Sequence, residues 1–136
     1  MTDEMPVPKR TKFCYVGAPA IFALEIACQL IERAFDVGGC YLVGSCLERP
    51  DWRDVDVRLI MDDDAFANLF PDVNVEAVSW ELDPRWLLMT VSISQWLSAQ
   101  TGLPVDFQFQ PRAHANTKHK GKRHAIGRYM APKSER

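Results

Sequence analysis

Three aspartates occur on two segments in which apolar and polar residues alternate. Asp54 and Asp56 are two residues apart in the segment 54–61, and Asp106 lies in the segment 104–110. Side chains two apart on a strand point to the same face, so Asp54 and Asp56 are expected to project side by side. Because Mg²⁺ and Mn²⁺ take hard carboxylate ligands, aspartates that converge on one sheet face are typical of a metal site for phosphate chemistry. The same aspartates could instead be solvated residues that keep an open sheet face in water.

A Gly-Ser pair precedes these aspartates. Gly44-Ser45 ends the apolar run 40–43 and lies nine residues before the first aspartate of the pair. A turn this small lets backbone N–H groups and one hydroxyl approach a phosphate closely. Arg58 falls on the same face as the aspartates, where it is either a phosphate clamp or the partner of a structural ion pair. In the intervening loop Trp52 could stack a base, although a half-buried loop tryptophan is the commoner arrangement.

Helices and strands can be placed around these residues from the spacing of apolar side chains. Apolar residues recur at helical spacing after Pro19, and we expect that helix to continue until the glycine pair 38–39 ends it. The run 40–43 predicts a buried strand. The segments 54–61 and 104–110 predict strands with one apolar and one polar face.

The segment between these strands predicts two further helices. The acidic run 62–64 is interpreted as the cap of a short helix over 65–70 rather than as a metal site. Residues 71–82 leave a helical turn and a strand open. A long helix is expected over 83–100, with an aspartate as its cap and a proline at its first position. Apolar residues cover most of its circumference, so we expect it to be deeply buried or packed against another subunit, which leaves a homo-oligomer open.

Together these elements predict an α+β fold, in which a mixed β-sheet carries helices on one face and leaves an open acidic face on the other. The chain of 136 residues has the size of one domain. We expect an N-terminal extension over 1–18, a domain over 19–110 and a basic C-terminal tail over 111–136.

The charge is distributed unevenly along the chain. Residues 1–110 hold 8 Lys and Arg against 17 Asp and Glu, a net charge of −9, whereas residues 111–136 hold 8 against 1, a net charge of +7. Opposite fields attract, so the tail could fold back onto the acidic body or bind nucleic acid. Composition alone does not choose between these partners.

Several classes of protein are not expected from this composition. The four cysteines match no metal or redox spacing, and the three histidines recur every five residues without a nearby cysteine. We therefore expect reduced thiols and no zinc site. No apolar run approaches the roughly 18–20 residues of a membrane-spanning helix. The first ten residues lack the apolar stretch of a signal peptide, so we expect a cytoplasmic protein without a membrane partner.

The order of these elements, with Gly44-Ser45, the pair Asp54 and Asp56, and Asp106, resembles the nucleotidyltransferase superfamily that includes DNA polymerase β and the minimal bacterial nucleotidyltransferases. In that family a helix precedes an apolar strand that ends in Gly-Ser. A loop then leads to an Asp-x-Asp strand, and a third carboxylate lies on a later strand. The resemblance implies a nucleotidyltransferase-like sheet and a nucleotide-binding, metal-binding transferase. Such an enzyme moves a nucleoside monophosphate from an NTP such as ATP to a hydroxyl through two Mg²⁺ or Mn²⁺ ions.

The resemblance also implies a role for each matched residue. Asp54 and Asp56 would hold both metal ions, and Asp106 would act on the catalytic ion. Gly44 and Ser45 would hold the β- or γ-phosphate. The acceptor is not identified by the sequence and could be a protein, an RNA or a small molecule.

The basic tail supplies further candidates for nucleotide binding. We expect residues 111–128 to lie along or beside the acidic sheet face, where their charge would meet the triphosphate. A neighbouring subunit could equally order this segment. The candidate nucleotide-binding cations are Arg58 on the strand and Arg112, Lys118, Lys120, Lys122 and Arg123 in the tail.

Two other functions remain open. The chain could be a catalytically weak or inactive NTP-binding or partner-regulating module of the same fold, because the residues 46–49 after the Gly-Ser pair depart from the family pattern. It could also bind nucleic acid through the cations of its tail, since Lys and Arg release counterions on binding phosphates. The tail has few aromatic residues, which argues against single-strand binding by stacking.

Overall fold

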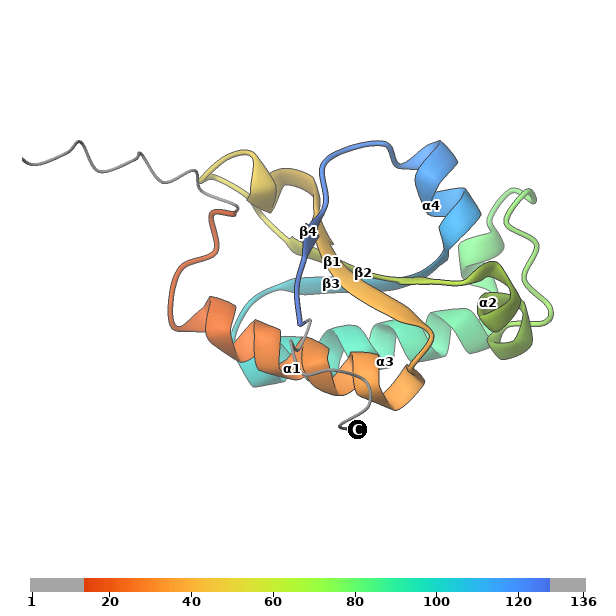
Figure 1. The fold of residues 1–136 in the computed structure, drawn as a ribbon, viewed down its shortest axis with the longest axis horizontal. Coiled ribbons are helices and arrows are strands. Elements are labelled where there is room, and N and C mark those ends of the chain that lie inside the picture. The colour runs from red at the N-terminus through yellow and green to blue at the C-terminus, as the bar shows by residue number, and fades with distance from the viewer. Residues whose placement is uncertain (1–13, 128–136) are drawn as a thin grey trace, which may run out of the picture.

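The computed structural model describes residues 14–127, so most of the predicted N-terminal extension and the tail residues 128–136 lie outside the described residues. The chain alternates helices and strands (Figure 1). In chain order they are α1 (Ala20–Phe35), β1 (Gly38–Val43), the 3-10 turn η1 (Gly44–Leu47), β2 (Val55–Met61), α2 (Asp63–Leu69), the 3-10 turn η2 (Trp80–Leu82), α3 (Pro84–Thr101), β3 (Val105–Pro111), α4 (Arg112–Lys118) and β4 (His124–Ala125).

The strands form one four-stranded mixed sheet in the order β3-β2-β1-β4. β1 runs antiparallel to β2 and to β4, and β2 runs parallel to β3. Helices α1 and α3 lie together on one side of the sheet, and α4 lies on the other (Figure 1). The predicted α+β class and the mixed sheet are therefore confirmed.

The core fills the space between the sheet and the helices α1 and α3. The apolar faces of the three longer strands meet both helices there, as Val57, Phe107 and Phe109 are fully buried. Polar groups of α3 fasten it to β3: the indole of Trp86 donates to the Phe109 carbonyl over 3.1 Å. The hydroxyl of Ser94 accepts from the Phe107 amide over 2.9 Å. These contacts fix the strand that carries Asp106 against the helical layer.

Two predicted boundaries are wrong at the first helix and strand. Helix α1 ends at Phe35, and its C-cap Asp36 adopts the left-handed backbone region with φ 50. Gly38 and Gly39 instead begin β1, which is two residues longer than predicted. A Cβ at Gly38 would overlap the Ile60 carbonyl of β2, so this glycine permits close strand pairing rather than a helix stop.

The acidic run 62–64 opens α2 as predicted, with Asp63 and Asp64 in the first turn, but it makes no side-chain capping hydrogen bond. Asp62 stands at the cap position without a side-chain capping hydrogen bond. Its carboxylate instead pairs with Arg112 over 3.2 Å, and the Asp63 carboxylate accepts from the Ala113 amide over 3.0 Å. Both carboxylates thus tie the start of α2 to the start of α4.

Helix α3 is less buried than its apolar composition predicted. Asp83 caps it through a hydrogen bond from the Trp86 amide, as expected. Only Trp86, Thr90 and Leu97 are buried, whereas Leu88 is 69% exposed. Met89 and Ile93 pack against the core as partly buried residues, whereas Leu87, Val91 and Trp96 are exposed like Leu88.

The basic segment after β3 folds back over the sheet. α4 follows β3 directly, and His124 of β4 pairs with Leu42 of β1. Ala115 and Ile126 are buried, and the Ile126 amide donates to the Cys40 carbonyl over 3.0 Å. The sheet face predicted to be open is therefore partly covered by residues 112–127.

Two further predictions concern the loop tryptophan Trp52 and membrane-spanning helices. The side chain of Trp52 is half-buried, and its indole donates to the Tyr15 carbonyl over 2.9 Å, as expected for a structural loop tryptophan. Within residues 14–127, no helix combines the length and the apolar character needed to cross a membrane.

Candidate functional site

A cavity of about 720 Å³ lies between the polar face of the sheet and the segment that connects β3 to β4. Its floor is built by alternate residues of two neighbouring strands, and its rim by the turn after β1. Its opposite wall comes from α4 and residues 119–123. The floor includes Asp56, Arg58, Ile60, Gln108 and Gln110, and the rim includes Val43, Gly44, Ser45 and Glu48. The wall includes His114, Lys118, His119, Gly121, Lys122 and Arg123.

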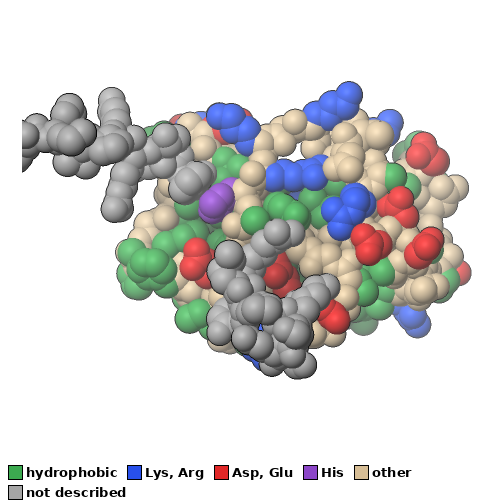
Figure 2. Space-filling view, in the orientation of Figure 1, with side chains coloured by type: hydrophobic (Ala, Val, Ile, Leu, Met, Phe, Trp, Pro, Cys, Tyr) green, Lys and Arg blue, Asp and Glu red, His purple; other side chains and the backbone are tan. Residues whose placement is uncertain are grey.

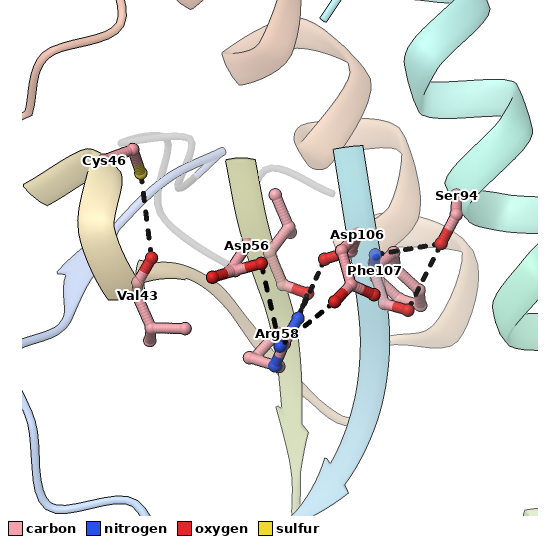
Figure 3. A network of polar contacts seen from close by, with 8 residues as sticks. Val43, Cys46, Asp56, Arg58, Ser94, Asp106 and Phe107 are labelled. Atoms are coloured by element: carbon pink, nitrogen blue, oxygen red, sulfur yellow. Dashed lines mark hydrogen bonds and ion pairs between the residues drawn. The ribbon is translucent and has the colours of Figure 1, made fainter. Parts of the chain in front are cut away.

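Asp56 and Asp106 lie directly opposite each other on the parallel pair β2 and β3. Both point to the polar face, with Arg58 between them (Figure 3). The Arg58 guanidinium is 3.6 Å from an Asp106 carboxylate oxygen and 4.0 Å from an Asp56 carboxylate oxygen. It also donates to the backbone carbonyls of Asp106 over 2.8 Å and Val57 over 3.1 Å. Only 12% of its side chain is exposed, so the guanidinium is held in place from both strands.

Burial and neighbouring charges act on Asp56 in opposite directions. Desolvation of its carboxyl is the main cause that raises the pKa of Asp56 above its ordinary value. The Arg58 guanidinium lowers that pKa, whereas the negative charges of Asp106 and Asp54 raise it further. Asp56 is thus a partly desolvated carboxyl within a group of like charges, which a second cation would stabilise in its ionised form.

The Gly-Ser pair stands at the rim beside this carboxyl. Gly44 has φ +79, and a Cβ added to it would collide with the Asp56 carboxylate. The backbone of η1 can approach Asp56 only because this residue is a glycine. The half-buried Ser45 follows at the cavity edge, and its carbonyl accepts from the amides of Glu48 and Arg49, each over 3.0 Å.

Cations line the wall opposite the carboxylates. Lys118, Lys122 and Arg123 border the cavity, and Figure 2 shows lysine and arginine side chains gathered along the upper part of the molecule. Arg123 is held by a hydrogen bond of 3.0 Å to the Asn116 side chain. The other two predicted cations lie elsewhere: Arg112 pairs with an aspartate before α2, and Lys120 is exposed and does not border the cavity.

The predicted metal ligands are only partly brought together. Asp56 and Asp106 are adjacent, whereas the exposed Asp54 precedes β2 rather than lying within it. Within residues 14–127, no three His, Cys, Asp or Glu side chains are grouped so that they could hold a metal ion. The oxygen donors suit Mg²⁺ by their chemistry. In this structure the Arg58 guanidinium pairs with two of them, Asp56 and Asp106.

The far end of the cavity contains residues that the sequence analysis did not single out. Gln108 and Gln110 continue the polar face of β3 beyond Asp106, and Trp80 of η2 stands next to His114 of α4 with ring centroids 5.4 Å apart. The alternation of β3 could have revealed both glutamines, since they share a face with Asp106. The contact between Trp80 and His114 joins segments far apart in sequence, and no local pattern predicts it.

Two titratable groups near the cavity are held in their neutral forms. Burial, followed by the charges of His119 and Lys118, lowers the pKa of His114, so its imidazole is uncharged at neutral pH. Burial raises the pKa of the Cys46 thiol to about 11, and its Sγ donates to the Val43 carbonyl over 3.7 Å. All four cysteines are free, and this protonated thiol is no nucleophile at neutral pH.

Comparison with known proteins identifies no relative of this chain. No protein-family model, no curated protein and no solved structure matches the chain. The site therefore has to be interpreted from its own chemistry.

Proposed function

We propose that the protein is a nucleotidyltransferase that binds a nucleoside triphosphate in this cavity. One observation carries the proposal: Asp56 faces Lys118, Lys122 and Arg123 across a single cavity whose rim is Gly44-Ser45. Asp106 does not line the cavity but is the neighbour of Asp56 across β2 and β3. Lysine and arginine side chains can neutralise a polyanionic triphosphate from one side. The reacting phosphate also needs a metal ion, which carboxylates bind. Opposed walls of this kind suit a phosphate chain bound between them.

In this proposal the side chains of Lys118, Lys122 and Arg123 neutralise the β- and γ-phosphates. The acceptor oxygen attacks the α-phosphorus, the bond to the bridging α–β oxygen breaks, and pyrophosphate leaves with that electron pair. The acceptor proton is released to water. The three cations act on the departing pyrophosphate, where negative charge develops during the reaction.

Asp54, Asp56 and Asp106 are the residues that would hold Mg²⁺ or Mn²⁺. When bound, such an ion activates the attacking oxygen and neutralises the leaving group. Because the Arg58 guanidinium lies between Asp56 and Asp106, it has to release their carboxylates before an ion binds there. Arg58 then becomes free to bind phosphate.

The position of a radioactive label tests this function. The protein is incubated with Mg²⁺ or Mn²⁺, a cell lysate as the source of acceptors, and an NTP labelled at either the α- or the γ-phosphate. Nucleotidyl transfer places the α-label on an acceptor and releases the γ-label as pyrophosphate. Asp56→Asn and Asp106→Asn should abolish the transfer, whereas Asp72→Asn, at an exposed position away from the cavity, should retain it. Transfer of the γ-label, or transfer by Asp56→Asn, contradicts the proposal.

A catalytically inactive NTP-binding module is the second candidate. The ion pairs of Arg58 favour it, because a guanidinium already balances the two carboxylates without a metal ion. In this case the protein binds NTP, and neither label is transferred under any metal condition. Nucleic-acid binding by the tail is less favoured, because Lys118, Lys122 and Arg123 face the cavity. The two other cations predicted to bind nucleic acid are Lys120, which is exposed, and Arg128, which lies outside the described residues.

A further inference from the structure

The cavity changes in chemical character along the strands. At one end are Gly44-Ser45 and Asp56, and at the other are Ile60 and Gln110, which pair with each other across β2 and β3. Ile60 lies four positions after Asp56 on β2, a distance of roughly 13 Å along the strand at the usual rise per residue. The floor is thus long enough for a phosphate chain at one end and a further group of the same ligand at the other.

The Gln110 end of the cavity contains a glutamine that is buried except where it lines the cavity. Gln110 is only 3% exposed, yet it lines the cavity. Among the described residues its side chain makes no hydrogen bond within the protein, and the same holds for Gln108 two residues earlier. Its amide atoms are not among the buried side-chain atoms that lack a partner, so they are open to the cavity, where they present two donors and an acceptor. Gln110 therefore offers a donor and an acceptor to whatever fills this end.

Aromatic rings line the same cavity as that amide. Trp80 and His114 both line the cavity, and their ring centroids are 5.4 Å apart. His119 lies next in line, 5.3 Å from His114. The lowered pKa of His114 keeps its ring uncharged, and uncharged aromatic surface is what a nucleobase stacks on.

We propose that this end of the cavity binds the nucleobase of the triphosphate, and that Gln110 selects an adenine base by pairing with its edge. The amide group of glutamine matches the adjacent donor and acceptor of adenine with two hydrogen bonds. Trp80 and His114 supply the apolar surface for the ring. The inference rests on the proposed nucleotide site. It adds the residues that bind the nucleobase, which the phosphate-binding residues do not contact.

Calorimetric titration with two ligands tests the assignment. ATP carries the base, whereas inorganic tripolyphosphate carries the same phosphate chain without it. Wild-type protein should bind ATP at least ten-fold more tightly than tripolyphosphate. Gln110→Met, which keeps the length of the side chain, should weaken ATP binding roughly ten-fold, the equivalent of about 1.4 kcal/mol, and leave tripolyphosphate binding unchanged. The control, Gln95→Met on the exposed side of α3, should change neither.

The possible results separate this inference from the function on which it rests. Equal binding of ATP and tripolyphosphate by the wild type, or unchanged ATP binding by Gln110→Met, overturns the base site and leaves the phosphate site standing. If the wild type binds neither ligand, the proposed function fails, and the base site fails with it. The wild-type comparison needs no variant and therefore decides the matter even if Gln110→Met does not fold.

Discussion

Arg58 joins the two strands that carry the carboxylates. Its guanidinium pairs with Asp56 and Asp106 and donates to two backbone carbonyls. A lysine has the charge but not the planar, multidentate geometry that these four contacts use. Arg58 is thus both a structural ion-pair partner and a candidate phosphate ligand, the two roles between which the sequence did not choose.

Arg58→Lys should lower the free energy of unfolding by about 1–3 kcal/mol, because a nearly buried guanidinium loses most of its hydrogen bonds. Chemical denaturation measures the change. Arg53→Lys, at an exposed position just before β2, is the matched control and should stay within about 0.5 kcal/mol of the wild type. Equal stability of both variants would show that the Arg58 contacts add nothing to the fold.

Asp56→Asn is expected to separate stability from function. The pKa of Asp56 is raised in the folded protein, so its contribution to stability is present below the ordinary Asp value of 3.8 and is lost as the pH rises through the folded-state pKa. At neutral pH the charged carboxyl therefore costs stability, and an uncharged asparagine avoids this cost. We expect the Tm of Asp56→Asn at pH 7 to equal or exceed that of the wild type by about 2–4 °C.

The pH dependence of the Tm difference tests whether the raised pKa of Asp56 is its cause. The Tm difference between Asp56→Asn and the wild type should shrink as the pH falls toward the ordinary Asp value of 3.8. The exposed Asp72→Asn should show no such trend. A large loss of stability in Asp56→Asn at neutral pH would mean that its ion pair with Arg58 outweighs its desolvation.

At the scale of elements, the turn after β1 depends on a glycine for two reasons that can be measured separately. Gly44 and Gly102 both have positive φ, +79 and +73, so alanine is strained at either position. A Cβ at Gly44 also meets the Asp56 carboxylate, whereas at Gly102 it meets nothing within 4 Å. Gly102→Ala should lower the free energy of unfolding by about 1 kcal/mol, and Gly44→Ala by roughly 2–4 kcal/mol. If both variants lose the same free energy of unfolding, the Asp56 carboxylate does not lie against Gly44.

Alternation along single strands explains why the floor of the site could be predicted. The polar face of β2 and β3 followed directly from the spacing of Asp56, Arg58 and Asp106, and the register then placed both aspartates side by side. Asp54 was placed on the same strand, but β2 begins one residue later. A strand end depends on its pairing partners, and a repeating pattern does not mark it.

Contacts between distant elements explain what the sequence did not reveal. Two carboxylates of the acidic run 62–64 contact α4, fifty residues later, and do not cap the helix that follows them. The apolar residues of α3 predicted either deep burial or packing against another subunit, and within this chain only Trp86, Thr90 and Leu97 are buried. In both cases the residue types have the local preference on which the prediction relied. The contacts that their side chains make are set by elements distant in sequence.

For the molecule as a whole, the charge asymmetry predicted a contact between body and tail. Residues 112–127 fold along the polar face and place Lys118, Lys122 and Arg123 on the cavity wall. The segment is also part of the core, because Ala115 and Ile126 are buried. Truncation after Gln110 would therefore disturb folding, and single substitutions of the cations test their role more cleanly.

The most direct test of the account is the affinity of ATP for three lysine variants, measured by calorimetric titration. Lys118 and Lys122 border the cavity, whereas Lys120, between them in sequence, is exposed and does not. Lys118→Gln and Lys122→Gln should each weaken ATP binding roughly three- to ten-fold, more at low salt than at high salt. Lys120→Gln should bind ATP as tightly as the wild type. Equal affinity in all three variants, or a loss confined to Lys120→Gln, would contradict the claim that this cavity binds the triphosphate.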